Sequence, residues 1–290
     1  MKAFGVISLI VVTAVVVINY KTGGSFNPQS LAQTVQEVAE DGYVADRSYS
    51  AEIQAVSSSR SLNDISAESA VQQCANGSYR LGEMLQIVAN QLDKNDDSTA
   101  RISSIMSERS LNDISAKSAV QQTANGTYRC VDLLLICAKE ADRKGEYGVE
   151  ISSIGSTMSL NDINADSAYQ QIANGSFRMS EILAILCRIT DKDNKFSTDI
   201  SSIISDMKIS DISSKSALHQ SVNGLYASAK LMAIFAKTMD RNDTYSSSIS
   251  SELSTLSLND ISSKSAPQQM ANGFYRLTGI AGLAAKGLNP

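Results

Sequence analysis

The sequence of 290 residues has no tryptophan, three prolines and a single histidine, His219. A catalytic centre or a metal site built on histidine therefore lacks the residues that it would need. The sequence also has no Cys-x-x-Cys pair to bind a metal and no glycine-rich loop to cradle phosphates. These absences predict a protein that is not an enzyme and that has no cofactor, no metal and no evident small-molecule substrate.

Basic residues do not gather anywhere along the chain, and the formal net charge is −5. Proteins that bind nucleic acid need a face rich in Lys and Arg to neutralise phosphates. The sequence therefore predicts no nucleic-acid partner.

One long apolar run, residues 3–18, stands near the start of the chain between Lys2 and Lys21. The apolar core of a secretory signal has about 7–15 residues and a spanning helix about 20, so this run falls between the two. Two interpretations are favoured over a buried core helix: an anchor that is retained, or a signal that is cleaved before Ser25. Both predict an exported or membrane-anchored protein of the cell envelope or the exterior. The symmetric lysines leave the orientation undecided.

Behind this run the sequence repeats itself every 49 residues. Five aspartates mark the period, namely Asp64, Asp113, Asp162, Asp211 and Asp260. The same period divides the chain into a hydrophobic segment (1–25), a degenerate half-repeat (26–60), four repeats (61–109, 110–158, 159–207 and 208–256) and a truncated fifth repeat (257–290).

Each repeat has the pattern of a long helix, a polar loop and a short helix. Apolar or small residues follow Val71 at alternating spacings of three and four as far as Leu92, which is helical periodicity. Asn76-Gly77 interrupts this segment with a turn-like pair, but the spacing continues through it in phase. We therefore predict one long helix, with two helices joined by a turn as the alternative. The chain is expected to be all-α: a solenoid-like or elongated array behind an N-terminal hydrophobic helix, capped by its half-units.

Four positions of each long segment share a narrow helical face that continues into Met84 and Ile87, and all of them are polar except in the fourth unit, where Ala227 replaces the arginine. This polar stripe comprises Ser69, Gln73, Asn76, Arg80, Ser118, Gln122, Asn125, Arg129, Ser167, Gln171, Asn174, Arg178, Ser216, Gln220, Asn223, Ser265, Gln269, Asn272 and Arg276. A covered polar stripe must be hydrogen-bonded along its length. We interpret it as a ladder that fixes the register between repeats or between subunits, with ligand binding as the alternative.

An aromatic residue recurs beside the stripe, at Tyr79, Tyr128, Phe177, Tyr226 and Tyr275. On a helical wheel, Tyr79 shares its face with polar residues. One prediction is therefore a row of exposed aromatic residues that form an interface. Packing of each ring on a neighbouring short helix is the other.

The four cysteines occupy different positions within their repeats and are expected to be buried apolar residues rather than a disulfide framework. The acidic loops resemble calcium loops in part, but they lack the glycine at position six and the glutamate at position twelve. Solvated turns are the better interpretation of these loops.

The leading functional expectation is a structural protein that is exported or associated with the cell envelope and whose helical repeats stack on copies of the same chain, as a filament, tube or surface layer. The alternative is a helical binding module, tethered to a membrane through residues 3–18 if they are retained, that presents the aromatic row to a macromolecule or lipid.

Overall fold

The computed structural model describes residues 48–58, 70–107, 119–156, 168–206, 217–254 and 266–289. Within these ranges the chain forms helices joined by turns, with no strand, so the all-α prediction is confirmed. The long helices are α4 (Ala70–Leu92), α6 (Ala119–Ala141), α8 (Ala168–Thr190), α10 (Ala217–Met239) and α12 (Ala266–Leu288). The short helices are α3 (Ser50–Ser58), α5 (Thr99–Ser107), α7 (Gly148–Ser156), α9 (Ser197–Ser205) and α11 (Ser246–Ser254).

The Asn-Gly pair does not break the long helices. Helix α4 runs through Asn76 and Gly77 for 23 residues, as predicted. Among the described glycines, Gly145 in a turn is the one with positive φ, at 70°. Gly77 therefore has ordinary helical backbone, and its lack of a side chain must matter for packing.

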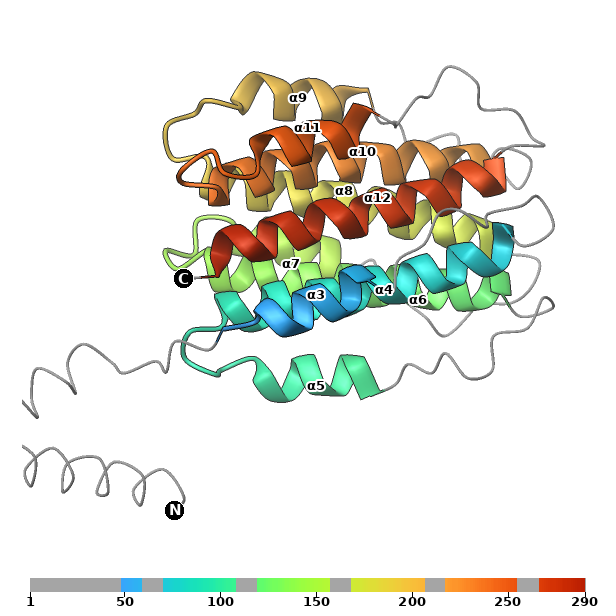
Figure 1. Cartoon of the computed structure of the whole chain (residues 1–290), viewed down its shortest axis with the longest axis horizontal. Helices are drawn as coiled ribbons and strands as arrows, with labels where there is room; N and C mark the ends of the chain where they lie inside the picture. Colours follow the sequence, from blue (N-terminus) through green and yellow to red (C-terminus); the bar gives the residue numbers. More distant parts are fainter. Residues whose placement is uncertain are drawn as a thin grey trace, which may run out of the picture. The chain divides into compact units, whose positions relative to one another are not determined.

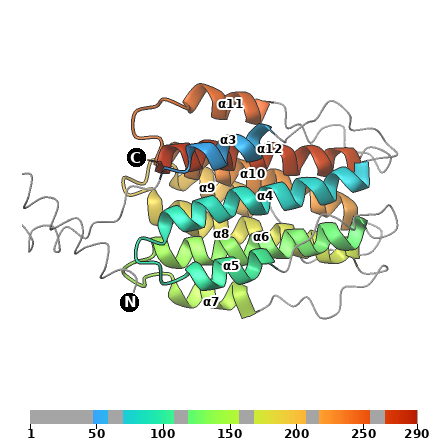
Figure 2. The same ribbon diagram turned by 60° about the horizontal axis from the view of Figure 1, so that its bottom comes forward.

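The five long helices form a closed ring. Each packs on the next in chain order, from α4 to α12, and α12 packs in turn on α4. In Figure 1 the turns that lead from the long helices to the short ones all lie at the same end, so the long helices run parallel. Figure 2 shows α4 and α6 side by side, and α6 packs in turn on α8. The expected open array is therefore corrected to a ring.

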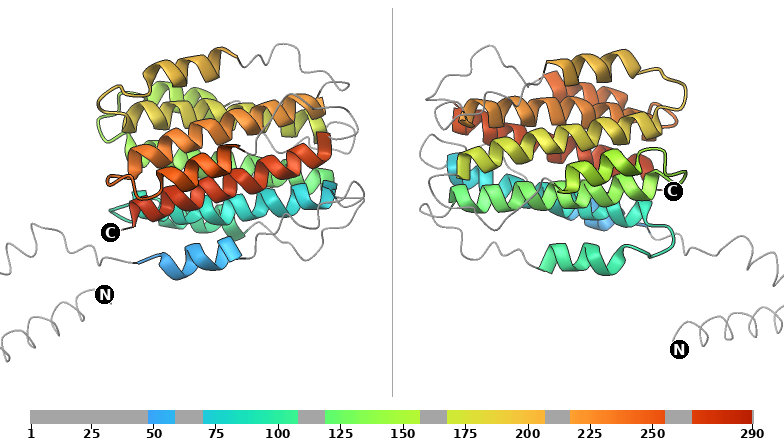
Figure 3. Two further views of the ribbon diagram at one scale, coloured as in Figure 1. Left: turned by 45° about the horizontal axis from the view of Figure 1, so that its top comes forward. Right: turned by 180° about the vertical axis from the view of Figure 1, so that it is seen from behind.

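The short helices lie on the outside of the ring (Figure 3). Helix α5 packs on α4 and α6, and α7, α9 and α11 occupy the three following interfaces in the same way. Helix α3 packs on α12 and α4 and so takes the fifth place. The two half-units, expected to cap opposite ends of an array, meet and complete one unit.

The junction between α12 and α3 repeats the geometry of an internal turn. Within the fourth unit, the backbone N–H of Tyr245 donates to Asp240 Oδ2 at 2.7 Å. Across the junction, the N–H of Tyr49 donates to Asn289 Oδ1 at 3.1 Å. Tyr49 and Asn289 are the residues that the 49-residue period aligns with this pair. The described residues thus begin and end inside a helix-to-helix turn.

The acidic loops close these turns through their first aspartate. Asp142 accepts the backbone N–H groups of Glu146 at 2.9 Å and Tyr147 at 2.8 Å. Asp191 accepts two N–H groups from residues 195 and 196, at 2.9 and 2.8 Å. The recurring acid therefore has a structural role in the turn.

The core combines the inner faces of the long helices with one isoleucine from each short helix. Leu81, Leu85 and Val88 are fully buried, and Ile53 of α3 is 1% exposed. Ile102, Ile151, Ile200 and Ile249 take the same place in the other short helices. All four cysteines are free and buried, as predicted.

The apolar run of residues 3–18 lies outside the described residues. Among the helices that are described, none is long and apolar enough to cross a membrane.

Candidate functional site

The glutamines of the polar stripe lie at the interfaces between neighbouring long helices. Tyr79 donates its hydroxyl to Gln122 Oε1 at 2.5 Å. At the interface that closes the ring, Tyr275 donates to Gln73 Oε1 at 2.7 Å. The same bond joins Tyr128 to Gln171 and Tyr226 to Gln269.

The asparagines of the stripe reach the same hydroxyls, since Asn174 Nδ2 donates to the Tyr128 oxygen at 3.1 Å. These hydrogen bonds join one unit to the next within a single chain. The serines of the stripe, namely Ser69, Ser118, Ser167, Ser216 and Ser265, lie outside the described residues.

The five recurring aromatic rings are buried, with exposed fractions between 1% and 4%. The expectation of an exposed aromatic row is therefore wrong. A Cβ placed on Gly175 would lie 3.3 Å from Tyr128 Cδ2, which shows that the ring packs on the glycine of the next long helix. The aromatic ring therefore packs on a long helix rather than on the short helix of the alternative prediction. A single helical wheel could not predict this contact, because it does not include the neighbouring long helix.

Burial controls the chemistry of the phenol and thiol groups. It raises the pKa values of Tyr128 and Tyr226, although hydrogen bonds from neighbouring asparagines partly oppose the shift. Burial also raises the pKa of Cys137 to about 12 and that of Cys187 further still. These groups are protonated near neutral pH and act as hydrogen-bond donors rather than nucleophiles.

The interface between α8 and α10 differs from the others because Phe177 has no hydroxyl. Buried serines connect these helices instead. Ser180 Oγ lies 2.8 Å from Ser228 Oγ and donates to the carbonyl oxygen of Gly224 at 2.9 Å. A second kind of polar contact thus holds this interface.

The arginines of the stripe pair with acids three residues further along the same helix. Arg80 lies 2.7 Å from Glu83 and Arg178 lies 2.7 Å from Glu181. Arg129 and Asp132 are 3.9 Å apart.

The fifth unit departs from this pattern, because Gly279 stands where the acid would be. Arg276 pairs at 2.9 Å with Glu252 of α11 instead. Glu252 in turn replaces an apolar residue of the other short helices, which have Ile105, Ile154 and Ile203 at this position.

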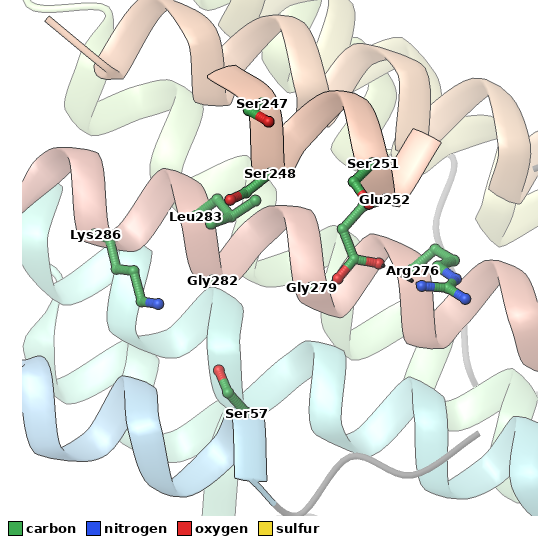
Figure 4. A pocket seen from close by; sticks show the side chains of 10 residues that line it. All are labelled: Ser57, Ser247, Ser248, Ser251, Glu252, Arg276, Gly279, Gly282, Leu283 and Lys286. Atoms are coloured by element: carbon green, nitrogen blue, oxygen red, sulfur yellow. Dashed lines mark hydrogen bonds and ion pairs between the residues drawn. The ribbon is translucent and has the colours of Figure 1, made fainter. Parts of the chain in front are cut away.

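These changes lie around a groove of about 480 Å³ that runs along α12 between α3 and α11. Its lining residues are Ser57, Ser247, Ser248, Ser251, Glu252, Arg276, Gly279, Gly282, Leu283 and Lys286. In Figure 4 the Glu252 carboxylate and the Arg276 guanidinium face each other near one end, and Lys286 lies toward the other end. The groove is the candidate functional site.

A leucine occupies the same channel in the second unit. In the second unit, a Cβ on Gly155 would touch Leu135 Cδ1 at 3.4 Å, so the leucine lies against its short helix. At the equivalent position of the fifth unit stands Gly282, beside Ser57 of α3. Comparing the units for their differences, rather than for what they share, would have revealed this groove from the sequence.

The groove offers hydroxyls, an ion pair and an ammonium group. No histidine or cysteine lines it, and the described part of the chain contains no cluster of His, Cys, Asp or Glu that could hold a metal ion. This set of groups can bind through hydrogen bonds and charge.

No protein-family model matches the chain, and comparisons with curated proteins and with solved structures found no match either.

Proposed function

We propose that this chain is a binding module without catalytic activity, in which a closed helical ring serves as a rigid scaffold for the groove along α12. The observation that carries the proposal is the interface between α12 and α4. Tyr275 and Gln73 are 202 residues apart in the sequence. In a ring of five 49-residue units, this separation is equivalent to the 43 residues between Tyr79 and Gln122, counted across the junction. The ring therefore closes with the same contact that joins α4 to α6, α6 to α8 and α10 to α12.

Ring closure argues against assembly by repeat stacking. In a solenoid, the outermost repeats keep a free face on which another copy can stack. Here Gln73 of the first unit accepts the hydroxyl of Tyr275 in the last unit, so both faces are covered by the same chain. A filament or surface layer would need a different surface from the one that joins the units.

This binding role differs from the binding module expected as the alternative, because the aromatic row is buried and does not supply the contacts. Residues 3–18 supply the proposed tether or export signal, which places the module in the cell envelope or outside the cell. The non-enzymatic part of the proposal follows from the groove lining, which pairs serine hydroxyls with no histidine base.

Multi-angle light scattering of the full chain in detergent, combined with negative-stain microscopy, tests this proposal. The expected result is one chain per particle and discrete particles of uniform size. Large regular particles in both measurements would overturn the proposal and favour the self-assembling structural protein.

A further inference from the structure

One lining residue of the groove is a glycine whose replacement would require only the end of a flexible side chain to move. A Cβ at Gly282 would lie 3.2 Å from Met84 Cε, the end of a flexible side chain, and 3.6 Å from Ser57 Oγ. At Gly126, in contrast, a Cβ would lie 2.8 Å from Ser78 Cβ on the next helix. Glycine inside a helix is less favourable than alanine. Because Gly282 has no side chain, the groove extends to the backbone of α12 at this position, beside Met84 and Ser57.

The groups around that space are polar. The side chains of Arg276 and Glu252 are 23% and 17% exposed, so their ion pair is largely shielded from water. Lys286 is exposed, and no acidic partner for it is found among the described residues. Two cations and one carboxylate give the lining a net positive charge. Leu283 is the one large apolar side chain among the lining residues.

We propose that this groove binds a polyhydroxylated carboxylate, that is, a sugar acid, either free or within an acidic polysaccharide. Serine hydroxyls both donate to and accept from ligand hydroxyls, and the Arg276–Glu252 pair adds N–H donors and carboxylate acceptors. The Lys286 ammonium group pairs with the ligand carboxylate. An apolar ligand would leave these polar groups without partners.

The size of the groove agrees with such a ligand, because small-molecule sites have volumes of about 300–1,000 Å³ and this groove has about 480 Å³. This inference rests on the proposed binding function, of which it names the ligand class.

Saturation-transfer NMR on the full chain, in a detergent without sugar groups, provides the test. The probes are galacturonic acid, an oligomer of galacturonic acid, galactose and acetate. We expect galacturonate to bind more tightly than galactose or acetate, because only galacturonate offers both hydroxyls and a carboxylate, and to bind more weakly as salt is added. Binding of the oligomer alone would identify the polymer as the source and still support the proposal.

Variants that restore the residues of other units locate the binding site. Gly282→Leu introduces the residue found at Leu135 and is expected to abolish binding. If circular dichroism shows that this variant is misfolded, Gly282→Ala provides the milder version. Lys286→Asn should weaken binding of galacturonate on the order of tenfold. The matched control, Lys237→Asn, changes the equivalent lysine outside the groove and should leave binding unchanged.

Two outcomes would overturn the inference: equal binding of galactose, acetate and galacturonate, or unchanged binding by the groove variants. Light scattering on the same sample separates the two proposals. Single-chain particles that bind none of the probes would refute the ligand class alone, whereas large assemblies would refute the proposed function.

Discussion

The glycine retained in every long helix permits a close approach between neighbours, and its replacement by alanine should be harmful at Gly126. A Cβ there would lie 2.1 Å from Ser78 Oγ and 2.8 Å from Ser78 Cβ. The hydroxyl can rotate away, although it donates to the Ala75 carbonyl at 2.8 Å. The Ser78 Cβ is fixed to the backbone of α4. Helices α4 and α6 must therefore separate to admit the new methyl group.

The expected cost follows from three contributions. Overpacking in a core costs about 1–3 kcal/mol, and disturbing the buried Ser78 hydrogen bond adds about 1 kcal/mol. Alanine regains about 1 kcal/mol over glycine as a helix former. We therefore expect Gly126→Ala to lower the free energy of unfolding by about 1–3 kcal/mol.

Two glycines serve as matched controls. At Gly273 the nearest atom to a new Cβ is Leu225 Cβ at 3.2 Å, and at Gly148 no atom lies within 4 Å. Gly273→Ala should change stability by less than about 1 kcal/mol, because the gain in helix propensity offsets a slight clash. Gly148→Ala should not destabilise the protein.

Urea unfolding followed by circular dichroism measures these effects, through a shift of the midpoint at constant slope. Ser78→Gly in the Gly126→Ala background should restore part of the loss, because the two positions are in contact. Equal losses at Gly126 and Gly273, or no rescue by Ser78→Gly, would refute the packing argument.

Three further predictions concern the interfaces and the closure of the ring. Phe177→Tyr supplies the missing hydroxyl and should stabilise the fold by about 0.5–1 kcal/mol, whereas Tyr128→Phe should destabilise it by about 1 kcal/mol. Urea unfolding measures both changes, and the opposite signs would contradict the role of the tyrosine–glutamine hydrogen bonds between units. Because burial raises the pKa of Tyr128 above its ordinary value of 10.0, the folded chain keeps a proton that the unfolded chain loses, so stability should fall as pH rises above this value. Phenolate absorbance should then appear together with the loss of helicity, and its appearance in the intact fold would contradict this expectation. A circular permutant can join Asn289 to Tyr49 through a four-residue turn and open the chain at residues 94–97 instead. It should keep the helicity and the unfolding midpoint of the original chain. Loss of either would contradict the equivalence of the α12–α3 junction and the internal turns.

The helices were predictable because their signals are local. The spacing of apolar residues from Val71 to Leu92 indicates one helix, and it outweighed the turn propensity of Asn76-Gly77. The burial of the cysteines was predictable from the same pattern. The burial of the aromatic rings was not predictable, because Tyr79 lies on a polar face of its own helix. The next long helix covers this face only in the folded ring.

Ring closure depends on the angles between packed helices, which a repeat period does not determine. The sequence nevertheless carried a signal for closure. The period aligns Tyr49 with Tyr245 and Asn289 with Asp240, so the half-units at the two ends add up to one complete unit. That arithmetic is compatible with capped ends as well as with a ring. The Tyr49–Asn289 contact at 3.1 Å distinguishes the two.

The position of α3 links the groove to the closure of the ring. Helix α3 lies across the interface of α12 and α4, and Ile53 packs there as its counterparts do elsewhere. The groove has Ser57 of α3 on one side and Ser248 of α11 on the other, so it forms only when α3 is docked. Anything that binds the folded form alone stabilises it by mass action. A ligand that contacts Ser57 together with the residues of α12 would therefore hold the ring closed at the junction of its two ends.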